Sequence, residues 1–454
     1  MSRMKGALRP HSSSASVEAD TDSVRRCDHA LALMLAHRGN PAAEVERVLA
    51  DDPQSLFGHC LRAALIVLAD DIAQRSALAA SVTVIEAACA DANHPARCHA
   101  AAARAWLERD PALALDRYGA IVAHRPRDIV ALVVAHALDF RLGRRQMLRD
   151  RVAQVLPAWE ANATGYASVL AMYAFGLEEN GDYRRAERMA RRALDLQPGH
   201  PGAIHVVAHV MEMQGRDLEG LVFLAATERA WIRETGFSVH LAWHRALFHL
   251  DAGDLHAALK VYDTQIANAD PSDISVLTDA SALLWRLQLR RFEIGERWGL
   301  LADRWEKRTL AGARVFHIVH AMMAFAAAGR TAAAAGLLQT LTEAEANDFA
   351  SSMPEAALAQ PFCKALIAFA RGDYAACVEW LTRVRDIAHR CGGSLAQCDL
   401  VHLTLTEAAL RARKALIAHS LVAERAMRKP ASGLNKLLQH RLRAMPGNKR
   451  SAAA

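Results

Sequence analysis

A turn recurs along most of the chain at intervals close to the length of one helical hairpin. Each of six glycines follows a helix-like stretch and precedes an Ala-rich one: Gly143, Gly181, Gly215, Gly253, Gly329 and Gly372. Their steps are 38, 34, 38, 76 and 43 residues, and 76 is two steps of 38. The omitted turn is expected near Arg291, and earlier turns at Arg109-Asp110, near Asp70 and at Gly39. This spacing predicts about ten helical hairpins of unequal length.

The clearest hairpin runs from Leu170 to Pro198. Its first helix has one apolar stripe with steps of three and four residues, made by Leu170, Tyr173, Ala174 and Leu177. Gly181-Asp182 then breaks that helix and starts the next. Ala186 and Ala193 allow two antiparallel helices to approach closely, and Pro198 ends the second helix. This pattern resembles the tetratricopeptide repeat.

The predicted fold is therefore all-α, a right-handed superhelical solenoid of tetratricopeptide-like helical hairpins. Composition agrees, because only 24 Gly and 14 Pro occur in 454 residues, which disfavours a sandwich or barrel with many turns. The alternative is an ordinary α bundle of unrelated helices. We expect a disordered N-terminal tail over residues 1–26 and the solenoid over 27–428. Residues 429–454 are predicted to form a basic, solvated tail whose helical middle would cap the last repeat.

Several functional classes are excluded by composition. The net charge of +6 is spread along the chain without a long basic stripe interleaved with aromatics, so no nucleic-acid partner is predicted. The sequence contains no run of 18 apolar residues, so a membrane-spanning helix is not predicted. The first 26 residues contain no apolar run of signal-peptide length. The eight cysteines contain no C-x-x-C pair and are expected to be reduced and mostly buried, which favours a cytoplasmic location.

One group of histidines is a candidate site. His205 and His209 are four residues apart, Glu212 follows three residues later, and His240 and His244 repeat the spacing in the next hairpin. In a tetratricopeptide frame these positions, and that of His320 two repeats later, face the concave groove rather than the packed stripe. First helices that face each other would bring four imidazoles and a carboxylate together.

Three roles are open for these side chains. They could fill space or contact a peptide, they could act on a small ligand as acid and base, or they could hold a metal. His205, His209, His240 and His244 are suitable ligands for a divalent transition metal, with Glu212 as a further ligand or general base. The pattern is not H-E-x-x-H, because Val206 occupies the Glu position.

Two other motifs are predicted to be structural. Gly392-Gly393-Ser394 lacks the Lys of a phosphate loop and is expected to form a turn and helix cap. A set of large side chains at helical spacing is expected in the core or groove wall: Trp243, Trp285, Met322 and Met323.

The chain also resembles the tetratricopeptide repeat protein 38 family over residues 135 to 440. The resemblance is carried by these segments: Met172–Glu179, His205–His209 with Glu212-Met213, His240–His244, Leu284–Leu287, and Gly392–Ser394 with Ala396-Gln397 and Asp399. It implies repeat-type helices, a cytosolic setting and no agreed activity. Leu395 and Cys398 stand where the family pattern has a polar residue and an Arg.

The predicted function is a repeat scaffold that binds a peptide, a protein segment or a small acidic ligand in its concave groove. The alternative is an enzyme, such as a metal-assisted hydrolase, that uses the histidines of the same groove.

Overall fold

The structure, a computed structural model, describes residues 17–70, 72–233, 235–271, 273–310, 313–346 and 356–445. Within these ranges the regular secondary structure is helical, beside one isolated bridge between Arg38 and Thr235. The described residues divide into two compact units. The first extends to Val207 and includes Arg233–Phe237; the second comprises Ala208–Ile232 and the chain from Ser238 onward. The predicted all-α class is confirmed.

The helices of the first unit are α1 (Val17–Ala36), α2 (Pro41–Asp51), α3 (Leu56–Ala69), η1 (Ile72–Gln74), α4 (Arg75–Ala88), α5 (Pro95–Leu107), α6 (Pro111–His124), α7 (Ile129–Arg141), α8 (Arg145–Val155), η2 (Leu156–Ala158), α9 (Tyr166–Glu179) and α10 (Tyr183–Leu196). The division between the units falls inside α11 (Pro201–Met213).

The second unit continues with α12 (Asp217–Ala226), α13 (Glu228–Trp231), α14 (Ser238–Ala252), α15 (Leu255–Val261), η3 (Tyr262–Ile266), α16 (Ile274–Leu289), α17 (Arg297–Glu306), α18 (Val315–Ala327), α19 (Thr331–Ala346), α20 (Ala356–Ala370), α21 (Tyr374–Val384), η5 (Arg385–Cys391), α22 (Leu395–Arg411), α23 (Ala415–Arg428) and α24 (Gly433–Arg443).

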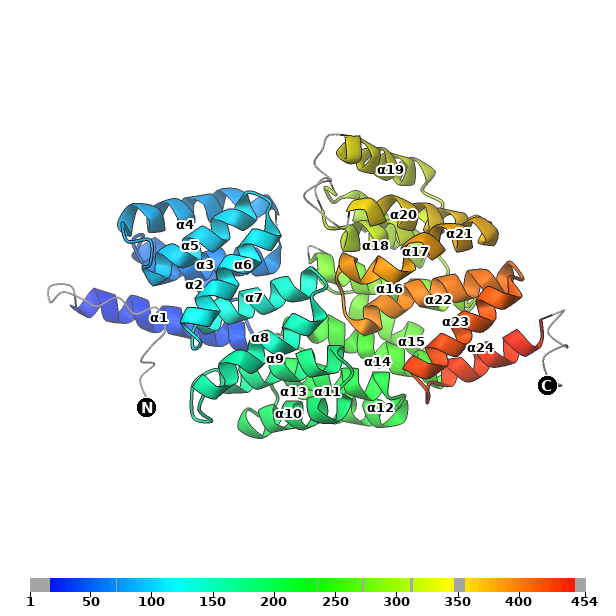
Figure 1. Cartoon of the computed structure of the whole chain (residues 1–454), viewed down its shortest axis with the longest axis horizontal. Helices are drawn as coiled ribbons and strands as arrows, with labels where there is room; N and C mark the ends of the chain where they lie inside the picture. The colour runs from blue at the N-terminus through cyan, green and yellow to red at the C-terminus, as the bar shows by residue number, and fades with distance from the viewer. Residues whose placement is uncertain are drawn as a thin grey trace. The chain divides into compact units, whose positions relative to one another are not determined.

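Each helix packs mainly on its neighbours in the sequence. In the first unit, α3 contacts both α2 and α4 and also packs against α1, α5 and α7 (Figure 1). In the second, α18 packs on α16, α17, α19 and α20. Contacts between consecutive helices, and between every second helix, are the arrangement expected of stacked helical hairpins.

The predicted turns adopt the left-handed backbone conformation that ends a helix. All six predicted glycines have φ between 64° and 89°: Gly143, Gly181, Gly215, Gly253, Gly329 and Gly372. Four further predicted positions also have positive φ, namely Gly39, Asp70, Arg109 and Arg291. The turn at Arg413, between α22 and α23, has φ 56° and was not among the predicted turns, although it lies 41 residues after Gly372, within the range of the other steps.

The residue after the turn glycine explains why a second helix starts at once. The Asp182 carboxylate accepts a hydrogen bond from the backbone N–H of Arg185 at the start of α10. Asp254 caps α15 in the same way, and Asp373 caps α21. The Gly-Asp pair therefore ends one helix and stabilises the first turn of the next, as predicted.

Small residues allow the paired helices to approach closely. Ala186 and Ala193 of α10 are fully buried. A Cβ added to Gly176 of α9 would lie 2.4 Å from the backbone oxygen of Leu148 in α8. Larger side chains at these places would force the helices apart.

The second unit departs from a simple row of hairpins. The helix α22 packs against α16, and α24 packs against α14, although each pair is far apart in the sequence. An open solenoid has contacts only between neighbouring repeats. The last helices therefore return to the first ones of this unit and enclose space between them.

The two ends of the chain differ from the predicted boundaries. The helix α1 begins at Val17, before the predicted start of the solenoid at residue 27, and residues 1–16 lie outside the described residues. At the other end, α24 forms where a capping helix was expected. Lys429, assigned to a solvated tail, is instead only 6% exposed. Residues 446–454 lie outside the described residues.

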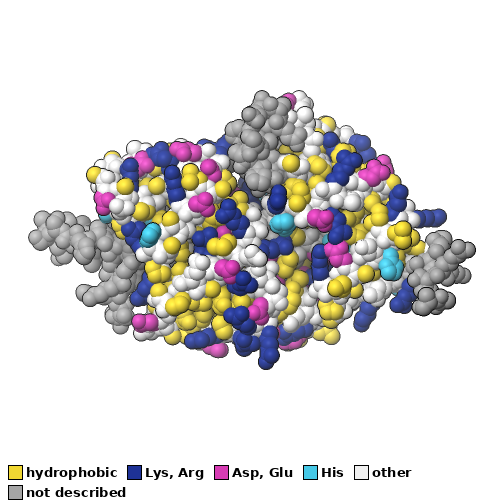
Figure 2. Space-filling model, viewed as in Figure 1, with side chains coloured by type: hydrophobic (Ala, Val, Ile, Leu, Met, Phe, Trp, Pro, Cys, Tyr) yellow, Lys and Arg dark blue, Asp and Glu magenta, His cyan; other side chains and the backbone are white. Residues whose placement is uncertain are grey.

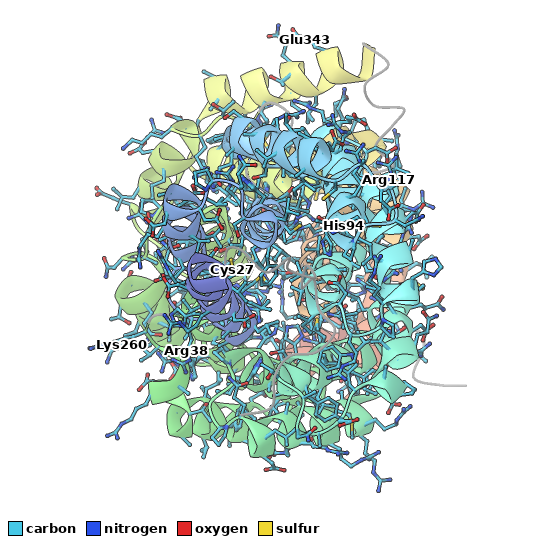
Figure 3. All side chains as sticks on the ribbon, turned by 90° about the vertical axis from the view of Figure 1, so that its left-hand side faces the viewer. Cys27, Arg38, His94, Arg117, Lys260 and Glu343 are labelled. Carbon is cyan, nitrogen blue, oxygen red and sulfur yellow. The ribbon has the colours of Figure 1, made fainter. Side chains whose placement is uncertain are left out.

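The distribution of surface charge and the burial of the cysteines agree with the expectations from the sequence. On the face drawn in Figure 2, the described Lys and Arg side chains are interspersed with Asp and Glu. The cysteines are free thiols, and six of the eight are buried; Cys27 on α1, labelled in Figure 3, is fully buried. Among the described residues, helices long and apolar enough to cross a bilayer are absent.

The turn geometry predicts opposite effects for two Gly→Ala substitutions. Gly372 has φ +80° and open space around a new Cβ, so Gly372→Ala is expected to lower stability by about 1 kcal/mol through backbone strain alone. Gly336 is exposed inside α19, also with open space, so Gly336→Ala is expected to raise stability by about 1 kcal/mol. Urea unfolding midpoints measure both changes, and a shift in the same direction would contradict the turn assignment.

Candidate functional site

The structure places the predicted site residues on three helices. His205, His209 and Glu212 lie on α11, His240 and His244 on α14, and His320 on α18. All are buried except His240, whose side chain is 20% exposed. The site residues on α11 follow one another at intervals of about one helical turn, and so do those on α14. Those on the same helix therefore lie on one face of it, as predicted.

Three of the histidines come together within the second unit. The ring centroids of His209 and His244 are 4.4 Å apart, and those of His240 and His244 are 4.8 Å apart. One nitrogen from each of these three rings lies within 4.8 Å of the other two. We call His209, His240 and His244 the histidine cluster.

The other two predicted histidines are His205, which lies in the first unit, and His320, which lies on α18. His205 belongs to the first unit, where its ring packs on Phe175 at 5.7 Å and on Phe237 at 4.9 Å. Nδ1 of His320 is 2.7 Å from the backbone oxygen of Phe316 on its own helix. The latter contact is local and fits a packing role for His320.

Two rings of the histidine cluster are oriented by buried carboxylates. Nδ1 of His240 donates to Oδ2 of Asp279 on α16 at 2.8 Å. Nδ1 of His244 donates to Oε2 of Glu212 at 3.0 Å. Trp243 stacks on the His240 ring at 5.2 Å with an interplanar angle of 12°. These contacts hold each imidazole in one orientation and place its proton on Nδ1.

Glu212 also begins a chain of charges in the interior of the second unit. Its Oε1 accepts a hydrogen bond from Nζ of Lys429 at 2.8 Å. The same ammonium lies 4.0 Å from Oδ2 of Asp399 on α22. Arg425 of α23 donates to that carboxylate at 3.0 Å. The network connects α11, α14, α22 and α23, with each charge facing one of opposite sign.

The pairing decides how these groups ionise. Burial acts to raise the pKa of Glu212, but Lys429 and the hydrogen bond from His244 outweigh it and hold the pKa well below its usual value. Burial acts to lower the pKa of Lys429, yet Glu212 and Asp399 raise it overall. Burial, followed by neighbouring His209, lowers the pKa of His244 to about 3. Glu212 is therefore an anion and His244 a neutral imidazole at neutral pH.

A cavity of about 60 Å³ adjoins this network. It lies where α22 and α24 return to α14 and α16, and Glu212, Asp399, Arg425 and Lys429 form part of its wall. Its apolar wall consists of leucines from α14, α16, α22 and α24: Leu247, Leu250, Leu289, Leu403, Leu434 and Leu438. We call this space the leucine–arginine cavity.

Two guanidinium groups in the cavity wall have no carboxylate within 4.0 Å among the described residues. Arg286 donates to the backbone oxygens of Ala282 and Ala396, and it lies over Trp243 at 5.1 Å. Arg290, one turn later at the end of α16, makes a single 3.3 Å hydrogen bond to the oxygen of Leu250. Burial lowers the pKa of both. By contrast, Arg441 in the same wall pairs with Glu407 at 2.6 Å.

The loop Gly392-Gly393-Ser394 serves as a helix start. Ser394 accepts a hydrogen bond from the N–H of Gln397, and the Gln397 side chain accepts one from the N–H of Ser394, forming a capping box for α22. The predicted cap is confirmed. Trp243, Trp285, Met322 and Met323 are buried, as expected for core residues.

Sequence reasoning missed several charged residues of this region. Arg286, Arg290, Asp279, Asp399 and Lys429 were not among the candidate site residues. A signal was present for Asp279 and Arg286, because they are the only charged residues of the mostly apolar helix α16. A charge in a helix that is buried all round needs a partner or a ligand. Lys429 carries no such signal, since it stands in a stretch rich in basic residues.

A comparison with known protein families finds no family model that matches this chain. The chemistry available to this chain therefore depends on the geometry of the site itself.

The buried pair between Glu212 and Lys429 predicts a large stability effect. Lys429→Met leaves the Glu212 carboxylate buried without its cation and is expected to cost about 3–5 kcal/mol. The neighbouring Arg428, which is 59% exposed and pairs with Glu424, is the control, and Arg428→Met is expected to cost under about 1 kcal/mol. Adding Glu212→Gln to Lys429→Met should recover part of the loss. Equal unfolding midpoints for the two single variants would contradict the buried pair.

His320 predicts a dependence of stability on pH. Burial lowers its folded-state pKa to about 4, whereas in the unfolded chain it is about 6.5. Below about pH 6.5 the unfolded chain binds a proton that the folded chain does not, so stability falls as pH decreases toward 4. From pH 7 to 5 the wild type should lose roughly 2 kcal/mol more than His320→Gln.

The exposed His419 provides the comparison for this effect. His419→Gln should keep the wild-type pH dependence, as measured by denaturant midpoints at several pH values. A His320→Gln variant with an unchanged pH dependence would show that His320 is not buried as a neutral ring.

Proposed function

We propose that the protein is a tetratricopeptide-type binding scaffold whose second unit holds a small anionic ligand in the leucine–arginine cavity. The observation that carries this proposal is the pair Arg286 and Arg290, two guanidinium groups in one cavity wall without a carboxylate within 4.0 Å among the described residues. A buried cation without a counter-charge is costly. The carboxylates of the same wall act on these two groups only from beyond 4.0 Å: Asp399 and Glu212 on Arg286, and Asp251 and Glu407 on Arg290. An anionic ligand would supply a directly paired counter-charge.

The shape of a guanidinium supports this choice of ligand. Its planar N–H groups match the oxygens of a carboxylate or phosphate in a two-point hydrogen bond. Arg290 uses one donor on Leu250, which leaves other donors for a ligand. Arg286 is held firmly by Ala282 and Ala396, so its position is set before binding. Such preorganisation reduces the entropy lost on binding.

The rest of the cavity favours a small ligand with an apolar body over a peptide. About 60 Å³ is several times the roughly 10–15 Å³ that one water molecule needs, but it is far below the space of a peptide segment. Leucines from four helices line the remainder. A short-chain carboxylic acid combines the two requirements, with its carboxylate at Arg290 and its alkyl chain against the leucines.

The proposal also covers the type of repeat, the handedness of the superhelix and the family. The hairpin turns at Gly181 and Gly372, with their Asp N-caps, support a tetratricopeptide-like repeat. The right-handed superhelix and the relation to the tetratricopeptide repeat protein 38 family are part of the same proposal. Free cysteines support a cytoplasmic location. The alternative function, metal-assisted hydrolysis, requires that the histidine cluster hold a metal ion that activates water.

Binding of matched anionic and neutral probes tests the proposed function. Hexanoate and the neutral hexanamide are titrated into the full-length protein by calorimetry, and hexanoate is expected to bind more tightly. Arg290→Gln should weaken hexanoate binding by roughly 10–100-fold, because a hydrogen bond to a charged group contributes about 1.5–3 kcal/mol.

The exposed Arg371, at the end of α20 in the same unit, is the matched control. Arg371→Gln should bind hexanoate as the wild type does. Equal affinity for acid and amide, or equal loss in the two variants, would reject an anion site at Arg290.

A further inference from the structure

We propose that the histidine cluster of the second unit is a binding site for a divalent transition metal of the zinc class. His209 comes from α11, and His240 and His244 come from α14. One ring nitrogen of each lies within 4.8 Å of the other two. Tetrahedral zinc ligands at about 2.1 Å from the metal are roughly 3.4 Å apart, so small shifts of the side chains that keep the Nδ1 hydrogen bonds would bring these nitrogens into coordination.

The carboxylates behind the rings are a second, independent observation for a metal site. Asp279 accepts from Nδ1 of His240 at 2.8 Å, and Glu212 accepts from Nδ1 of His244 at 3.0 Å. Zinc-binding histidines commonly donate their other ring N–H to a carboxylate, which sets the tautomer and makes the coordinating nitrogen more basic. The metal would then be coordinated by Nε2 of His240 and Nε2 of His244. Two such pairs occur in the one cluster.

The supporting groups are themselves held in place. Glu212 is fixed from its other oxygen by Lys429 at 2.8 Å. Asp279 is 3% exposed on α16, and the His240 ring is stacked on Trp243. A preorganised set of ligands reduces the cost of assembling the coordination sphere.

The donor set favours zinc over harder cations. Imidazole nitrogens suit zinc, copper and nickel, whereas calcium and magnesium prefer oxygen ligands. Three imidazoles leave a fourth position of a tetrahedral ion for water. His240, with 20% of its side chain exposed, is the residue of the cluster that solvent reaches.

Zinc binding to the full-length, tag-free protein tests the site. The protein is first treated with a chelator and dialysed, and Zn²⁺ is then titrated in competition with a chromophoric chelator. One equivalent per chain is expected to bind with submicromolar affinity. Cobalt substituted for zinc should give the intense visible absorption of a tetrahedral ion. No saturable binding by the wild type would overturn the proposal.

Variants then assign the ligands. His240→Ala and His244→Ala should each weaken zinc binding at least 100-fold, and Asp279→Asn should weaken it about 10–100-fold through His240. His320→Ala removes a buried histidine of the same unit outside the cluster and should bind zinc as the wild type does. Since His244 is fully buried, circular dichroism first checks that each variant is folded. His240 is partly exposed, so a folded His240→Ala variant that keeps full affinity would overturn the proposal even if His244→Ala does not fold.

Discussion

The second unit depends on the buried carboxylate of Glu212. One of its oxygens accepts from His244 and the other from Lys429, so both sides of the charge are satisfied inside the protein. Removing a charge from water costs several kcal/mol, and only close pairing compensates for it. Lys429 is 217 residues further along the chain, so this interaction ties the end of α23 to α11.

Glu212 also connects the two proposed sites. It lies in the wall of the leucine–arginine cavity and at the same time orients a ring of the histidine cluster.

The regular part of the fold could be predicted from local sequence. Gly181-Asp182 specifies a left-handed turn and a helix cap within a few residues. The turn at Arg291 was predicted only from the spacing of the turns before and after it. The turn at Arg413 was missed, although its distance of 41 residues from Gly372 is within the range of the other steps. The candidate site was predicted in part: the i, i+4 spacing identified the histidines on each helix, but it could not identify Asp279, Arg290 or Lys429.

The sequence by itself determined the all-α class, most of the turns and the helix faces that carry His209, His240 and His244, because these follow from interactions within three or four residues. Tertiary structure alone decided that the chain divides into two units and that α22 and α24 return to α16 and α14. It also decided that His205 belongs to the first unit and that Lys429 is buried against Glu212. Contacts between residues two hundred positions apart depend on how all the intervening helices pack, and a local sequence pattern does not determine that packing.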